Sequence, residues 1–204
     1  MQDEIKIILK QEAAAISNIP LNGGFEDAVN LIYNSVHVKG GRLIASGMGK
    51  AGQIGANIAT TLSSTGTPST FMHPSEAQHG DLGMLKQNDV LLVISNSGKT
   101  REIIELIHLS HKLHSQIPVV LITGNKDSEL VDLCNAVIFT GNPPEVCTLG
   151  LTPTTSTTTM TVIGDIIVVL LMKKIKFSTA DYAKRHHGGY LGLKSRIKAK
   201  RDEN

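Results

Sequence analysis

Five short apolar runs, separated by stretches with helical spacing, constrain the fold of this chain more than any other feature. The clearest run is VLLVI at 90–94, which ends at a Ser/Gly turn and leads into an amphipathic helical pattern. Such a run, closed by a turn and followed by a helix, is typical of a buried parallel strand. Strands are predicted at 42–46, 69–72, 90–95, 119–123 and 136–140.

Helical patterns fill the intervals between these strands and continue after the last one. Parallel strands joined by helices require right-handed crossovers, so the pattern predicts an α/β fold. We expect a three-layer α/β/α sandwich around a five-stranded, parallel, doubly wound sheet. Helices are predicted at 52–64, 102–114, 129–134, 156–174 and 179–184.

Two amphipathic helices are expected before the first strand. Asp3 is a candidate cap for the first of them, and Ile5 and Leu9 lie on its apolar face. No linker, repeat or low-complexity run divides the rest of the chain. We therefore expect N-terminal helices that pack on the core (1–40), one domain (41–194) and a basic tail (195–204).

Composition and charge argue against several classes of protein. A net charge of +2 over 204 residues offers no strong field for nucleic acid. The longest apolar stretch, 166–172, is far shorter than the ~20 residues of a membrane span. No signal peptide is apparent, and the only cysteines are Cys134 and Cys147. We expect a cytoplasmic protein, without a membrane or nucleic-acid partner, in which both cysteines are buried small side chains.

The glycine-rich turn after the first strand, SGMGKAG, is the first candidate binding segment. Its glycines fit the G-x-G-x-x-G spacing of dinucleotide sites, but the second strand ends without the acid that would hold a ribose. Lys50 lacks the following Ser or Thr of a P-loop. We expect the turn to let a ligand approach Ser46, Gly47 and Gly49 and to present the Lys50 ammonium; a packing turn with a surface lysine is the alternative.

The turn after the third strand combines hydroxyls, a glycine and a helix N-terminus, which suits a phosphate monoester. Glu102 falls in the first turn of the following helix, where the helix dipole favours a carboxylate. It is either a capping residue or an acid–base group beside a bound phosphoryl sugar. The candidate phosphate-binding residues are Ser95, Asn96, Ser97, Gly98 and Thr100.

A histidine pair, His73 and His79, brackets the segment after the second strand. The carboxyl ends of parallel strands are where sites form, so this position favours a functional histidine. A structural role or a metal site are the alternatives, although no third ligand has a recognisable metal spacing.

Polar residues also gather ahead of the long helix at 156–174. Glu145 precedes a run of hydroxyls larger than one helix cap requires: Thr154, Thr155, Ser156 and Thr157. His186 lies beyond that helix, so it must fold back to reach a site in its own subunit or in a neighbouring one.

Together these segments resemble the sugar isomerase (SIS) domain family and, within it, the arabinose 5-phosphate isomerases. The resemblance runs from about residue 40 to residue 194. The turn at 95–100, which we call the hydroxyl loop, is shared by the whole superfamily, whereas the histidine-containing and Thr-rich segments are more specific. The matching segments are SGMGKAGQIG (46–55), STGTP (64–68), HPSEAQHGDLGM (73–84), ISNSGKTRE (94–102), LGLTPTTSTT (149–158) and HHGG (186–189).

The resemblance implies an enzyme that interconverts ribulose 5-phosphate and arabinose 5-phosphate without a cofactor or a metal. This reaction supplies 3-deoxy-octulosonate (Kdo) for lipopolysaccharide or capsule. The resemblance also implies a homotetramer with active sites at subunit interfaces. The family pattern H-P-G-G is HHGG here, which leaves His186 or His187 as the functional histidine; position favours His186. The implied active-site residues are Lys50, His79, Glu102, Glu145 and His186.

Many family members continue into a pair of CBS domains, which are expected to be absent here. A feedback inhibitor, for which CMP-Kdo is the candidate, is then expected to enter the active-site cleft. Two other functions remain open: a non-catalytic phosphosugar sensor and a different aldose–ketose phosphate isomerase. The hydroxyl loop fits all of these, whereas the acid–base residues favour an isomerase.

Overall fold

A computed structural model describes residues 1–202 and shows a parallel five-stranded sheet with the strand order β2-β1-β3-β4-β5. Gly47 pairs with Ile94, and Ile94 pairs with Ile122, so the carboxyl ends of the central strands lie at one edge. This is the predicted doubly wound sheet. The strands are β1 (Leu43–Gly47), β2 (Ser69–Phe71), β3 (Val90–Ile94), β4 (Val119–Thr123) and β5 (Ala136–Phe139).

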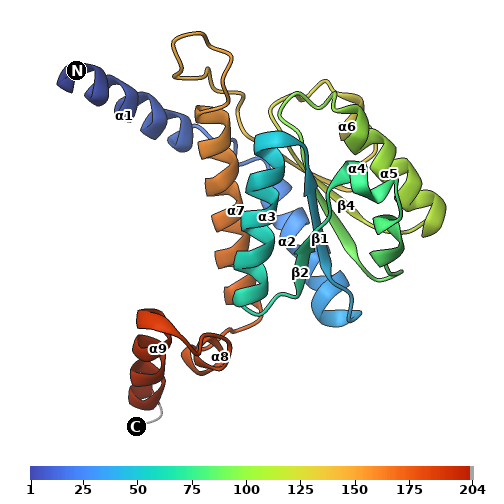
Figure 1. Ribbon diagram of the computed structural model, residues 1–204, viewed down its shortest axis with the longest axis vertical. Helices are drawn as coiled ribbons and strands as arrows, with labels where there is room; N and C mark the ends of the chain where they lie inside the picture. The colour runs from blue at the N-terminus through green and yellow to red at the C-terminus, as the bar shows by residue number, and fades with distance from the viewer. Residues whose placement is uncertain (203–204) are drawn as a thin grey trace.

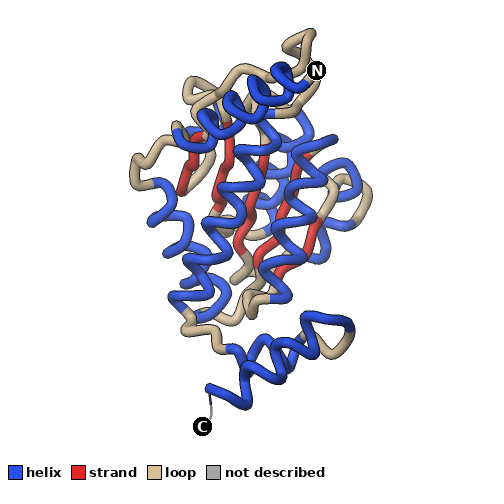
Figure 2. The backbone as a smooth tube through the Cα atoms, turned by 90° about the vertical axis from the view of Figure 1, so that its left-hand side faces the viewer, coloured by secondary structure: helices blue, strands red, loops and turns tan. Residues whose placement is uncertain are grey.

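Helices cover both faces of the sheet, as Figures 1 and 2 show from two sides. Leu92 and Ile94 pack into the core on one face, while Leu91 and Val93 pack into the core on the other. Burial on both faces explains why β3 is a continuous apolar run instead of an alternating one. The predicted three-layer sandwich is confirmed. One layer holds α2 (Gly24–Tyr33), α3 (Gly49–Ser64) and α7 (Thr155–Lys174); the other holds α4 (Pro74–Ala77), α5 (Arg101–Leu113) and α6 (Glu129–Asp132).

Most predicted boundaries differ from the observed ones by only one or two residues. The largest shift is at α3, which begins at Gly49, three residues before its predicted start at 52. Short helical turns also occur where no regular element is predicted, since α4 and the 3₁₀ helix η2 (Asp81–Met84) occupy the segment after β2. A π-helix, η1 (Asn34–Val38), extends α2.

The first helix, α1 (Gln2–Ser17), projects from the body of the molecule (Figure 1). Met1 occupies its N-cap position, so Asp3 lies inside the helix instead of capping it as predicted. Ile5 and Leu9 on its apolar face are 49% and 64% exposed. α1 meets the body near its C-terminal end, where Ala15 is buried. Within one chain, α2 packs on the core, whereas most of the apolar face of α1 has no partner among residues 1–202.

The longest helix, α7, packs against α1, α2 and α3. It is long and apolar enough to cross a membrane by length and composition alone, a test that buried core helices also meet. Half of its most apolar window is buried inside the protein. α7 therefore serves as a core helix of the sandwich, and it connects the two ends of the molecule.

Two further helices, α8 (Thr179–Arg185) and α9 (Gly189–Asp202), pack on each other beyond the C-terminal end of α7 (Figure 1). The region predicted as a basic tail, 195–204, is helical through Asp202. Residues 203–204 lie outside the described residues.

Candidate active site

A cavity of about 910 Å³ opens at the carboxyl edge of the sheet. Residues that follow β1, β3, β4 and β5 contribute to its wall, together with the N-terminal turn of α7. A parallel sheet with helices on both faces places ligand sites at this edge. The predicted site residues that line the cavity are Lys50, Ser95, Asn96, Ser97, Thr100, Glu145, Ser156 and Thr157.

Lys50 reaches the cavity from the first turn of α3, directly after the glycine-rich turn. Ser46, in β1 just before the glycine-rich turn, does not take the ligand-binding role that was predicted for it. The Ser46 side chain is fully buried, and its hydroxyl donates a 2.7 Å hydrogen bond to the carbonyl of Met72. Ser46 therefore ties β1 to the end of β2 and does not present its hydroxyl to the cavity.

The hydroxyl loop forms a concave turn between β3 and α5. The hydroxyls of Ser95 and Thr100 share a 2.7 Å hydrogen bond, and the Ser97 hydroxyl accepts one from the N–H of Lys99 at 3.2 Å. Gly98 has φ +65°, and a Cβ there would collide with the side chain of Ser128, so the turn needs glycine. Thr100, at the N-cap of α5, makes no side-chain cap bond, which leaves the first N–H groups of α5 for an anion.

Glu145 lies in the segment between β5 and α7 and caps the N-terminus of α7. Its carboxylate accepts hydrogen bonds from the N–H of Thr154 at 2.6 Å, the Thr154 hydroxyl at 2.9 Å and the N–H of Ser156 at 3.3 Å. Burial alone would raise the pKa of Glu145, but the donors on Ser156 and Thr154 outweigh it and hold the pKa below its usual value. Glu145 is therefore an anion held by a helix N-terminus.

The hydroxyls ahead of α7 divide into two groups. Ser156 and Thr157 line the cavity. Thr155 is buried on the other side, where its hydroxyl donates to the carboxylate of Glu12 at 2.8 Å and accepts from the N–H of Val146 at 3.1 Å. Thr155 thus links α1 to the segment that carries Glu145, and it does not present its hydroxyl to the cavity.

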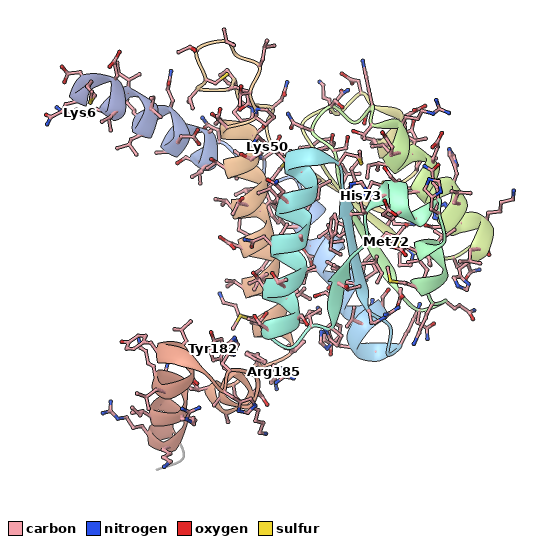
Figure 3. All side chains as sticks on the ribbon, viewed as in Figure 1. Lys6, Lys50, Met72, His73, Tyr182 and Arg185 are labelled. Atoms are coloured by element: carbon pink, nitrogen blue, oxygen red, sulfur yellow. The ribbon has the colours of Figure 1, made fainter. Side chains whose placement is uncertain are left out.

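Three of the five predicted catalytic residues lie outside the cavity wall in this chain, as do six of the predicted binding residues: Ser46, Gly47, Gly49, Gly98, Thr154 and Thr155. Glu102 is half-buried in the first turn of α5, and His79 is exposed between α4 and η2. His186 follows α8, beyond the far end of α7. Figure 3 shows Tyr182 and Arg185, its neighbours in α8, at the opposite end of the molecule from Lys50. The fold of one chain therefore brings Lys50 and Glu145 together but leaves His186 remote.

Residues 37–170 match the model of the SIS domain family. This chain is a member of the SIS domain family. The matched range covers the whole sheet and most of α7, and it therefore includes every residue that lines the cavity.

Known SIS proteins resemble this chain over most of its length. One solved structure is from Bacteroides fragilis NCTC 9343 and is described as a phosphosugar isomerase involved in capsule formation. It is 59% identical to this chain, with a TM-score of 0.92, and the match covers 93% of this chain and 99% of that chain. A structure from E. coli CFT073 in complex with arabinose 5-phosphate is 34% identical with a TM-score of 0.79, covering 89% of this chain and 95% of that chain.

Curated relatives extend this likeness. Arabinose 5-phosphate isomerase KdsD of Shigella flexneri is 46% identical over 154 residues, which make up 76% of this chain and 46% of that protein. This chain spans about half the length of the curated relatives that it matches.

Two asparagines in the wall of this SIS cavity, Asn125 and Asn142, are absent from the sequence predictions. A Cβ on Gly124 would lie 2.6 Å from Oδ1 of Asn96 and 3.2 Å from Oδ1 of Asn142, so the glycine makes room for two amide groups. Oδ1 of Asn96 is buried and has no hydrogen-bond partner within residues 1–202. A sequence signal exists, because a Gly-Asn pair follows shortly after both β4 and β5.

The two cysteines differ from each other, contrary to the expectation that both are buried small side chains. Burial raises the pKa of Cys134 to about 12. Cys147, in the segment beside the cavity, accepts backbone hydrogen bonds at its sulfur from Leu151 at 3.3 Å and Thr152 at 3.1 Å. Desolvation works against the thiolate there, but these N–H groups outweigh it and lower the pKa of Cys147.

His73 and His79 do not assemble a metal centre with other ligands in the described part of the chain. Residues 1–202 contain no group of three or more His, Cys, Asp or Glu side chains that could hold a metal ion. Nδ1 of His73 is buried without a hydrogen-bond partner, and the ring lies edge-on to Phe71.

Proposed function

We propose that this SIS domain is an aldose–ketose isomerase that interconverts D-ribulose 5-phosphate and D-arabinose 5-phosphate through an enediolate. One observation carries the proposal: the hydroxyl loop, Lys50 and Glu145 line the same cavity. An anchor for phosphate, a cation and a carboxylate are the groups that this reaction needs. The KdsD relatives and the E. coli structure in complex with arabinose 5-phosphate support the choice of a pentose phosphate.

The hydroxyl loop is assigned to the phosphate group of the substrate. Ser95, Ser97 and Thr100 offer hydroxyl donors, and the uncapped N-terminus of α5 adds backbone N–H groups. An anchored phosphate holds the reacting carbons at a constant place in the cavity. The binding energy of this remote group then contributes to orienting C1 and C2 for proton transfer.

Lys50 is assigned to the oxygen that gains charge as the enediolate forms. A fixed ammonium beside a developing oxyanion stabilises the transition state more than the ground state. Gly47 and Gly49 are assigned to the close approach of the sugar to the start of α3. Gly47 also leaves room for the backbone of Ala51 and Gly52, which a Cβ would meet at 2.9 Å.

Proton transfer between C1 and C2 is assigned to Glu102, Glu145 and His186 as a set. Glu145 would become a better base if substrate binding moved its carboxylate away from the donors on Thr154 and Ser156. His79 is assigned to opening the sugar ring or orienting a hydroxyl.

A homotetramer with active sites at subunit interfaces is part of the proposal, with His186 acting on a neighbouring subunit's cavity. The cavity lies at the N-terminal turn of α7, whereas His186 lies beyond its C-terminal end, and a helix of 20 residues is about 30 Å long. Exposed apolar side chains on α1 and α9, such as Ile7 at 57% and Leu193 at 53%, favour association with other copies.

Mixed oligomers test this arrangement. Lys50→Met and His186→Gln are each expected to be inactive alone. After the two are unfolded and refolded together, activity should return, because some interfaces combine an intact cavity with an intact His186. If mixing restores nothing, His186 acts within its own chain or not at all.

The physiological role follows from the reaction. We place the enzyme in the cytoplasm, supplying arabinose 5-phosphate for Kdo in lipopolysaccharide or capsule. CMP-Kdo, a later product of this route, is proposed as a feedback inhibitor that enters the active-site cleft. Competition between CMP-Kdo and arabinose 5-phosphate in a steady-state assay tests this, and an unchanged apparent KM for the sugar would exclude it.

A substrate panel tests the central proposal. Purified protein is incubated with arabinose 5-phosphate, glucose 6-phosphate and glucosamine 6-phosphate, and the ketose products are measured. We expect turnover of arabinose 5-phosphate alone. Turnover of a hexose phosphate would indicate a different isomerase, and binding without turnover would indicate a phosphosugar sensor.

A further inference from the structure

The ring of His186 stacks on the ring of Tyr182. Their centroids are 3.7 Å apart and their planes differ by only 6°. Tyr182 is itself supported by Phe177, which lies edge-on to it at 6.5 Å, and the guanidinium of Arg185 lies over Phe177 at 5.3 Å. These contacts hold the ring of Tyr182 and, through it, the plane of His186.

The backbone of Tyr182 determines which nitrogen of His186 carries the proton. Nδ1 of His186 lies 3.0 Å from the carbonyl oxygen of Tyr182. A carbonyl can only accept, so Nδ1 must be the donor, and in the neutral ring Nε2 then carries the free lone pair. The same carbonyl also accepts from the backbone N–H of His186 at 3.1 Å. Nε2 is therefore the nitrogen able to exchange a proton with a substrate.

The other side of the His186–His187 peptide is held by α9. A Cβ on Gly192 would lie 2.5 Å from the carbonyl oxygen of His186, so only glycine allows this approach. The guanidinium of Arg196 donates to the carbonyl oxygen of His187 at 3.2 Å. The backbone is thus clamped between α8 and α9. The His187 side chain, in contrast, is exposed and has no hydrogen-bond partner or ring contact within residues 1–202.

We propose that Tyr182 is the positioning residue of His186: its ring sets the imidazole plane and its carbonyl sets the tautomer, so that Nε2 is presented as the reacting nitrogen. The inference rests on the proposed function only for the use that His186 makes of this arrangement. It also selects His186 over His187, because only His186 has an orienting partner. The Tyr182 hydroxyl makes no hydrogen bond with the described residues. We therefore assign the orienting contact to the aromatic ring of Tyr182 and not to its hydroxyl.

Three variants of the 204-residue chain separate positioning from a structural role. Tyr182→Phe retains the ring, Tyr182→Leu removes it, and His187→Ala is a matched control one residue from His186. His186→Gln identifies the His186 signals in spectra of protein labelled with ¹³C in its histidine rings. The signals are read at a pH where the rings are neutral.

In the wild type and in Tyr182→Phe we expect upfield-shifted His186 ring protons from the stack, and a Cδ2 shift of the Nδ1–H tautomer. In Tyr182→Leu the upfield shift should disappear. The backbone carbonyl of residue 182 remains, but without the stacked ring the imidazole is no longer held against it, so the tautomers should mix. Its kcat should fall about 10-fold to 100-fold, as for a displaced catalytic group, with KM changing far less. Tyr182→Phe should recover at least half of the wild-type kcat, and His187→Ala should match the wild type in both readouts.

Two results would overturn the proposal: Tyr182→Leu retaining the His186 signature, or losing the signature while keeping the wild-type kcat. Failure of the proposed function looks different, because the wild type would then not turn over arabinose 5-phosphate at all. In that case the ring shift and the tautomer of Tyr182→Leu still decide whether Tyr182 orients His186.

Discussion

The Glu145 carboxylate accepts a 2.6 Å hydrogen bond from the backbone N–H of Thr154, so a side chain that lines the cavity also caps α7. The candidate active site is therefore built into the stability of the longest helix. A substitution of Glu145 is therefore expected to affect the stability of α7 as well as the proposed chemistry.

The acid dependence of stability should carry the signature of Glu145. Its pKa is lower in the folded protein than in the unfolded chain, so its stabilising contribution is complete above the unfolded pKa, near 4.3, and is lost as the pH falls through the lower folded pKa. Glu145→Gln should cost about 1 kcal/mol at pH 7, as for other helix caps.

Urea unfolding at pH 7 and at strongly acidic pH measures this difference. The gap in free energy of unfolding between wild type and Glu145→Gln should shrink as the pH falls. Asp165→Asn, which removes an exposed carboxylate from the middle of α7, is the control and should show no such trend. A gap that stays constant with pH would mean that the charge of Glu145 does not stabilise α7.

Removing the charge of Lys50 should slow the reaction without weakening the phosphate anchor. Loss of one group that stabilises an oxyanion lowers kcat by about 10²-fold to 10³-fold. Lys50→Met should therefore lose kcat in steady-state assays with arabinose 5-phosphate, while Lys112→Met, on the exposed side of α5, should not. Near-normal kcat in Lys50→Met would remove the ammonium from the mechanism.

Substitution within the hydroxyl loop should affect binding more than turnover. A hydrogen bond to a charged group is worth roughly 1.5–3 kcal/mol, so Ser97→Ala should raise KM about ten-fold or more. Ser63→Ala, on the exposed surface of α3, is the control. An unchanged KM would show that the loop does not hold the phosphate through Ser97.

Cys147 should react with alkylating reagents at a lower pH than Cys134. Backbone donors lower the pKa of the Cys147 thiol, whereas burial raises that of Cys134 to about 12, and the thiolate is the reactive form. Iodoacetamide labelling across a pH series, followed by mass spectrometry, should show Cys147 modified first, with an apparent pKa below the usual ~8.5. Equal labelling of both cysteines at neutral pH would contradict this.

Much of the fold could be predicted because the relevant signals are local. A strand buried on both faces, such as β3, must be apolar at every position, and its end is marked by the Ser/Gly turn that follows. The same logic led to Lys50, Ser97 and Glu145, which all follow strands. Parallel strands bring such segments to one edge whatever the details of packing.

Other predictions failed where a side chain had two possible partners. Ser46 and Thr155 have the hydroxyls expected of ligand-binding residues, but Met72 and Glu12 take their hydrogen bonds in the folded chain. Asp3 has a capping side chain, but α1 begins at Gln2, so Asp3 lies inside the first turn and does not cap it. Asn125 and Asn142 were missed because a Gly-Asn pair is equally typical of an ordinary turn.

The sequence by itself determined the order of strands and helices, the parallel sheet and the edge at which a site must form, since these follow from hydrophobic periodicity and turn chemistry over neighbouring residues. Only the tertiary structure decided which polar groups face the cavity, that Glu145 caps α7, and that α7 holds His186 and its partner Tyr182 at the far end of the molecule. Those outcomes depend on hydrogen bonds and packing between segments far apart in the chain, and local patterns do not specify which of several possible partners each polar group finds.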